Sequence, residues 1–86
     1  MFTTPNRKRV YPSLYVYQAI GRRAPRWTPE KIDECIANHI ATIADRDLHK
    51  SFEMKIAGIP LVGFSFTNRP NPGITVCVSD AYRPTN

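Results

Sequence analysis

The chain has 86 residues, of which 42% are apolar and 22% are charged, and its formal net charge at neutral pH is +5. This length allows one small domain, residues 1–86, and the composition excludes a long disordered tract. No apolar run approaches the roughly 18 residues of a membrane-spanning helix, and the start MFTTPNRKRV lacks the apolar stretch of a secretory signal. Only two cysteines occur, Cys35 and Cys77, so the sequence predicts a cytoplasmic protein with reduced thiols; a single disulfide is the alternative.

The positive charge is concentrated near the N-terminus. The first 26 residues contain no acidic side chain, whereas the remaining 60 contain six Lys or Arg against seven Asp or Glu, a net charge of −1. A surface selected only for solubility would mix the two signs. The excess charge therefore belongs to one segment, which suggests a polyanionic partner. The six cations of this segment are Arg7, Lys8, Arg9, Arg22, Arg23 and Arg26.

The first third of the chain predicts a basic tail followed by a strand. Residues 1–9 have little to bury and are expected to form a tail. From residue 10 to residue 20, β-branched and aromatic side chains alternate with a period of two, which favours a strand. Gly21 and Pro25 then end it, so residues 10–27 are expected to form a basic, aromatic strand and loop. We expect this strand to join the sheet, because one of its sides is apolar and has to be buried. The alternative is that the segment extends away from the rest of the domain as an arm. The side that needs cover comprises Leu14, Val16 and Ile20, and the opposite side comprises Tyr11, Ser13, Tyr15, Tyr17 and Ala19.

The next segment has the features of an amphipathic helix. The hydroxyl of Thr28 can cap free amides, Pro29 suits the first helical position, and Glu30 suits the positive end of the helix. Apolar residues then recur at helical spacing, so the sequence predicts a helix over residues 28–46. Its apolar face comprises Ile32, Cys35, Ile36, His39, Ile40 and Ile43.

Residues 51–79 switch to a period of two and predict three strands joined by the turns GIP and NRPNPG. Short connections favour an antiparallel meander with one apolar face, which the helix covers. Residues 80–86 are expected to form a polar tail. The predicted fold is thus α+β in the order β-α-β-β-β, with one helix packed on a small antiparallel sheet. The residues expected to face the helix are Phe52, Met54, Ile56, Val62, Phe64, Phe66, Ile74, Val76 and Val78.

The N-terminal third is the predicted binding surface. Clustered cations bind phosphates and exposed rings stack on bases, and Tyr15 and Tyr17 share one side of the predicted strand. The expected partner is a nucleic acid or a nucleoprotein complex. An acidic protein surface is an alternative, and so is a purely solubilising role for the charges. The predicted contact residues are Arg7, Lys8, Arg9, Tyr15, Tyr17, Arg22, Arg23 and Arg26.

The sequence predicts no cofactor, metal or small-molecule site. Cys35 and His39 have the helical spacing of two metal ligands, but a structural site needs two more. The four glycines stand apart, at positions 21, 58, 63 and 73, so no phosphate-binding loop is formed. The helix is too mixed in charge to lie on a membrane.

We therefore expect a non-enzymatic binding protein that docks on a nucleic acid or a nucleoprotein machine. Its size and composition are typical of inhibitors and accessory subunits, including those that phages and mobile elements encode. One alternative is a small toxin-like ribonuclease, in which His49 transfers a proton while Lys55 and Arg83 stabilise the phosphate. This reading requires the first and last strands of the meander to lie close together. Another alternative is a protein-interaction module whose exposed strand edge pairs with a partner, without nucleic acid.

Overall fold

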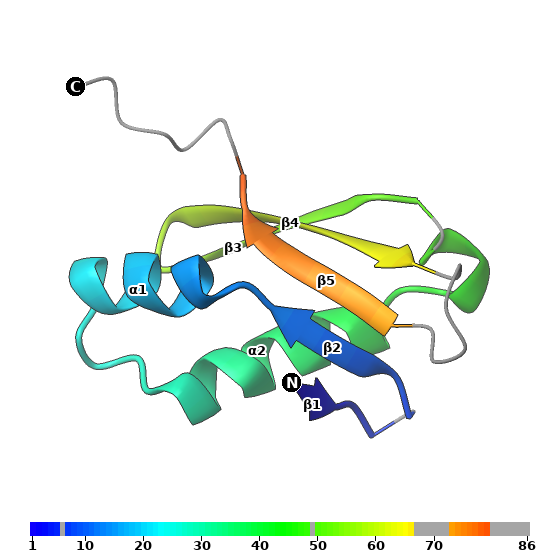
Figure 1. Ribbon diagram of the computed structural model, residues 1–86, viewed down its shortest axis with the longest axis horizontal. Coiled ribbons are helices and arrows are strands. Elements are labelled where there is room, and N and C mark those ends of the chain that lie inside the picture. The colour runs from blue at the N-terminus through cyan, green and yellow to red at the C-terminus, as the bar shows by residue number, and fades with distance from the viewer. Residues whose placement is uncertain (6, 49, 67–72, 80–86) are drawn as a thin grey trace.

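The computed structural model describes residues 1–5, 7–48, 50–66 and 73–79, which form an α+β fold (Figure 1). Five strands form a single mixed sheet in the order β1-β2-β5-β4-β3. Within the described residues, no helix is long and apolar enough to span a membrane. The elements in chain order are β1 (Phe2–Thr3), β2 (Arg9–Pro12), α1 (Leu14–Arg23), α2 (Pro29–Ala41), a short 3-10 turn (Asp45–Asp47), β3 (Phe52–Ile56), β4 (Ile59–Phe66) and β5 (Gly73–Val78).

The predicted C-terminal meander is confirmed, because β3 pairs with β4 and β4 with β5, both antiparallel. The rest of the predicted topology is wrong in three respects. The described residues form two helices instead of one; β2 joins the sheet, as expected, but parallel to β5; and Phe2–Thr3 in the predicted tail pairs with β2. The predicted turn at residues 68–73 lies outside the described residues except for its last glycine, and the tail at residues 80–86 lies wholly outside them.

The predicted strand over residues 10–20 is wrong beyond Pro12, because α1 occupies most of this segment. Ser13 caps the helix: its side-chain oxygen accepts the Tyr15 backbone N–H at 3.3 Å. Val16 and Ile20, four residues apart, are fully buried on one helical face. By contrast, Leu14 was expected to be buried with them but is 69% exposed. A helical period with an N-cap therefore outweighs the β propensity of the tyrosines and valine.

Helix α2 confirms the second predicted element. Thr28 accepts the Lys31 backbone N–H at 3.2 Å and Pro29 opens the helix, as the sequence indicated. The helix ends at Ala41, five residues before the predicted end at residue 46, and Thr42 caps it. Its buried residues are Ile32, Ile36 and Ile40.

Strand β4 presents the opposite face from the one predicted. Its buried residues are Ile59, Leu61 and Gly63, whereas Phe64 is 45% exposed. Gly63 pairs with Phe52 on β3, and a Cβ at Gly63 would lie 2.3 Å from the Phe52 ring. The ring thus fills the space beside the glycine, which fixes which side of β4 faces the core. The turn before β4 consists of residues 57 and 58, both with positive φ, instead of the predicted GIP.

Both helices pack on one face of the sheet. The buried residues of α1, α2 and the inner strand positions form one hydrophobic cluster, in which predicted inward residues of β3 and β5 are confirmed. The register places alternate residues of β2, β4 and β5 on the other face, which neither helix covers. The half-buried or exposed residues on this open face include Tyr11, Val62, Phe64, Thr75 and Cys77.

Candidate nucleic-acid interface

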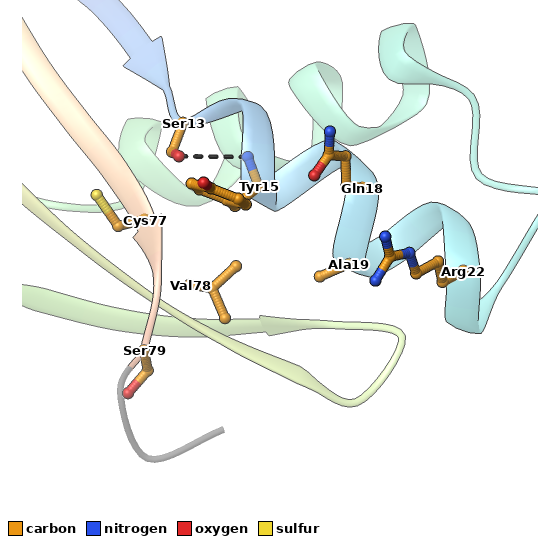
Figure 2. A pocket seen from close by; sticks show the side chains of 8 residues that line it. All are labelled: Ser13, Tyr15, Gln18, Ala19, Arg22, Cys77, Val78 and Ser79. Atoms are coloured by element: carbon orange, nitrogen blue, oxygen red, sulfur yellow. Dashed lines mark hydrogen bonds between the residues drawn. The ribbon is translucent and has the colours of Figure 1, made fainter. Parts of the chain in front are cut away.

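A groove of about 500 Å³ lies between α1 and the C-terminal end of β5, as Figure 2 shows. Pockets that bind small organic groups commonly have volumes of roughly 300–1,000 Å³, so a nucleotide-sized group fits this space. The groove brings together two residues that the sequence predicted as contacts, Tyr15 and Arg22. Its lining residues are Ser13, Tyr15, Gln18, Ala19, Arg22, Cys77, Val78 and Ser79.

The helix wall of the groove is one stripe of α1. Four residues of α1 line the groove, and they are spaced at intervals of three, one and three residues, which places them along the same side of the helix. They are Tyr15, Gln18, Ala19 and Arg22. The core stripe of Val16 and Ile20 is separate; of the four helix residues that line the groove, Ala19 also packs against the core, whereas Tyr15, Gln18 and Arg22 are exposed. Tyr15 is 72% exposed, and Gln18 and Arg22 are also exposed. An aromatic ring, an amide and a guanidinium therefore face the solvent beside one hollow.

The strand wall exists because β2 is shorter than β5. The last residue of β2, Pro12, pairs with Val76, and the Ser13 N–H then donates to the Val76 carbonyl at 2.7 Å. Cys77 and Val78 continue β5 beyond this point, without a paired strand of the described chain on the side of α1. Cys77 points to the opposite side of the strand from the core residues, as the sequence indicated.

The arginines at the end of α1 leave the helix in different directions. Arg22 lines the groove, whereas the Arg23 guanidinium lies over the turn between β3 and β4, near Gly58. Within the described chain, no ion pair joins Arg22, Arg23 or Arg26 to an acidic side chain. Arg22 and Arg23 also lie in the last turn of α1, where a cation offsets the negative end of the helix dipole.

Tyr17 does not share a surface with Tyr15, so the predicted tyrosine platform is wrong. Residues two positions apart lie on the same side of a strand but on nearly opposite sides of a helix. The Tyr17 hydroxyl donates to Asp33 Oδ1 on α2 at 2.5 Å. Burial raises the pKa of the Tyr17 phenol, and the Asp33 carboxylate that accepts its proton raises the pKa further. Tyr17 thus ties α1 to α2 instead of meeting a ligand.

The N-terminal cations form a second group, apart from the groove. Arg7 and Lys8 belong to the turn between β1 and β2, where the Lys8 N–H donates to Thr4 Oγ1 at 3.0 Å, and Arg9 begins β2. Figure 1 shows this turn and the C-terminal end of α1 near opposite ends of the molecule. The continuous basic arm of the sequence therefore becomes two separate basic surfaces.

The predicted ribonuclease site has one of its three residues, Lys55, within the described structure. His49 and Arg83 lie outside the described residues. Lys55 is exposed on β3, and β4 lies between β3 and β5, the first and last strands of the meander. The described residues hold no cluster of three or more potential metal ligands, and the His39 ring instead contacts the Phe52 ring, with centroids 5.6 Å apart.

Gln18 and the wall formed by β5 are not among the contact residues that the sequence predicts. As part of a strand, Gln18 would only interrupt the apolar side, but its spacing from Tyr15 and Arg22 is that of one helical stripe. The contribution of residues 77–79 depends on the relative lengths of β2 and β5, which no local pattern reveals. No family model matches this chain, and neither a curated protein nor a solved structure matches it.

Proposed function

We propose that this chain is a non-enzymatic nucleic-acid-binding protein that holds a single-stranded segment in the groove between α1 and β5. The observation on which the proposal depends is the exposed stripe of Tyr15, Gln18 and Arg22 along this groove. None of these side chains is buried in the core, so a ligand can reach all three.

The three side chains suit a nucleotide. A base stacks on the Tyr15 ring, which is worth about 1–3 kcal/mol per base when measured by alanine substitution. The Gln18 amide offers both donors and an acceptor to the edge of a base. The Arg22 guanidinium binds phosphate oxygens, with two parallel hydrogen bonds where the geometry allows. A base can enter the groove only if it is unpaired, so single strands are favoured over duplexes.

The charge distribution supports the same partner. The first 26 residues have a net charge of +6, and the remainder of the chain has −1. Arg23 is the last residue of α1 and Arg26 follows in the loop, so both add positive charge near this end of the helix, which attracts a polyanion over distances beyond direct contact. A protein of this size with such a surface suits an accessory or inhibitory subunit of a nucleoprotein complex.

The stacking contact is tested by fluorescence anisotropy with labelled single-stranded and duplex oligonucleotides of RNA and DNA. Tyr15→Ala is expected to weaken binding to single strands by roughly 5- to 150-fold, the equivalent of one lost stack. Leu14→Ala is the matched control, because Leu14 is 69% exposed on the same helix but does not line the groove. Equal affinities for the two variants would refute the groove as the binding site.

The phosphate contact is tested by the salt dependence of binding. Arg22→Gln is expected to reduce the slope of log affinity against log salt by about 0.7, the value for one phosphate on a single strand. Arg46→Gln changes the charge equally at an exposed site on the 3-10 turn, and is expected to leave the slope unchanged. If the wild-type chain binds no oligonucleotide even at low salt, the nucleic-acid proposal fails and an acidic protein surface replaces it.

A further inference from the structure

Strand β3 is the outermost strand on one side of the sheet. It pairs with β4 along one edge, and no described strand pairs with its other edge, as Figure 1 shows. The exposed side chains of Glu53 and Lys55, with the half-buried Met54, line a hollow of about 440 Å³ on this part of the surface. An edge strand of five residues has enough unpaired peptide groups to bind another strand.

The turn after β3 determines which peptide groups face this open edge. Residues 57 and 58 both have positive φ and form a two-residue turn, so Ile56 and Ile59 make the hydrogen-bonded pair that closes the hairpin. Hydrogen bonding alternates along an antiparallel strand. The N–H and C=O groups of Glu53 and Lys55 therefore point away from β4.

The sequence of β3, FEMKI, is self-complementary about its central residue. When two antiparallel copies are centred on Met54, Glu53 of each copy lies opposite Lys55 of the other. Both charged residues are exposed and lie on the open face, so each pairing joins opposite charges. On the helix-covered face, the same register sets Phe52 opposite Ile56, which continues the apolar face of the sheet.

We propose that two copies of this chain pair through β3 into a two-fold dimer with one continuous sheet. The pairing forms hydrogen bonds at the two outward-facing residues of each copy and two Glu53–Lys55 ion pairs. It is isologous, so the assembly closes at two chains instead of growing into a fibre. The dimer does not depend on the proposed nucleic-acid function, because α1 and β5 form the groove and β4 lies between β5 and β3.

Charge reversal gives a test that separates pairing from folding. The mass of the wild-type chain, measured by sedimentation velocity from about 5 to 500 μM, is expected to rise from 9.8 kDa towards twice that value. Glu53→Lys and Lys55→Glu each set like charges opposite one another at both pairs, and each is expected to weaken the dimer about tenfold or more. The double variant E53K/K55E restores both opposite-charge pairs and is expected to dimerise as the wild type does.

Two further samples complete the test. An equimolar mixture of the two single variants is expected to form a heterodimer, because one strand then carries two lysines and the other two glutamates. Glu34→Lys makes the same charge change as Glu53→Lys at an exposed site on α2, and is expected to leave the dimer intact. A wild-type chain that stays monomeric throughout, or a double variant no more dimeric than the single variants, overturns the proposal.

Discussion

Replacing Gly63 by alanine should destabilise the fold, although alanine is normally the better residue within regular structure. The new Cβ would lie 2.3, 2.7 and 2.8 Å from three atoms of the Phe52 ring. Ordinary contact begins at 3.4 Å, so the ring would have to move by roughly 1 Å. Phe52 is only 9% exposed and also contacts the His39 ring on α2, so this movement must disturb the packing between helix and sheet.

The expected cost follows from overpacking of a core, about 1–3 kcal/mol. The gain from removing a glycine, about 0.5–1 kcal/mol, acts in the opposite direction but is smaller. Urea unfolding followed by circular dichroism should therefore give a lower free energy of unfolding for Gly63→Ala. Replacing the Phe52 ring by the smaller leucine side chain should relieve the clash. The loss of unfolding free energy in the double variant Phe52→Leu, Gly63→Ala is therefore expected to be smaller than the sum of the losses in the two single variants.

Gly21→Ala is the matched control. Gly21 lies within α1, and a Cβ there would have no neighbour within 4 Å. The same substitution is therefore expected to raise the free energy of unfolding by up to about 1 kcal/mol, because alanine favours the helix. If Gly63→Ala proves neutral or stabilising, or if both substitutions change stability in the same direction, the close contact between Gly63 and Phe52 is not what orients β4.

Two further predictions concern the helices. Ile36→Ala removes a fully buried side chain between α2 and the sheet, and should cost about 2–5 kcal/mol in urea unfolding; a loss within about 0.5 kcal/mol would contradict this packing. The raised pKa of Tyr17 means that folding favours its neutral phenol, so this contribution to stability is complete below the ordinary pKa of 10.0 and is lost as the pH rises above it. In an alkaline absorbance titration, Tyr17→Phe should remove the tyrosinate signal that develops last, and Asp33→Asn should lower the pH at which Tyr17 ionises.

The sequence was sufficient where several local signals agreed. Helix α2 has a capping threonine, a proline at its first position and an apolar stripe at helical spacing, and it begins where predicted. The meander was also predictable, because Phe52–Ile56 and Gly73–Val78 alternate clearly between apolar and polar residues. In each case the local pattern and the tertiary packing favour the same structure.

The sequence was insufficient where one segment fits two periods. Between Val10 and Ile20 the apolar residues alternate, but Val16 and Ile20 also lie four apart, and Ser13 supplies an N-cap. The helix forms because it buries these two residues against β5 and β4, which lie far away along the chain. With the helix, Tyr15 and Tyr17 separate, and the predicted aromatic platform is lost. Tertiary packing overrides β propensity here.

Strand β4 shows the same ambiguity, because both alternations of IPLVGFSF contain apolar residues. The predicted inward set included Val62 and Phe64, but Leu61 and Gly63 face the core. The deciding factor is the partner across the strand pair, since the Phe52 ring needs a position without a side chain opposite it. Register of this kind depends on long-range pairing, so no local window could have revealed it.

The two proposals together predict how the protein binds a longer single-stranded nucleic acid. An antiparallel pair of edge strands has its two-fold axis perpendicular to the sheet, so both copies place α1 and α2 on the same side. The two grooves therefore face the same side of the dimer, and a strand long enough to reach both gains avidity without any new contact. The gain in affinity from a short to a long oligonucleotide should then be larger for the wild type and for E53K/K55E than for either single charge reversal. The double variant has the same net charge as the wild type and keeps both opposite-charge pairs, so an equal gain in these two proteins, with a smaller gain in both single variants, would point to the ion pairs and not to altered net charge. An equal gain in all four proteins would show that the strand engages one groove at a time.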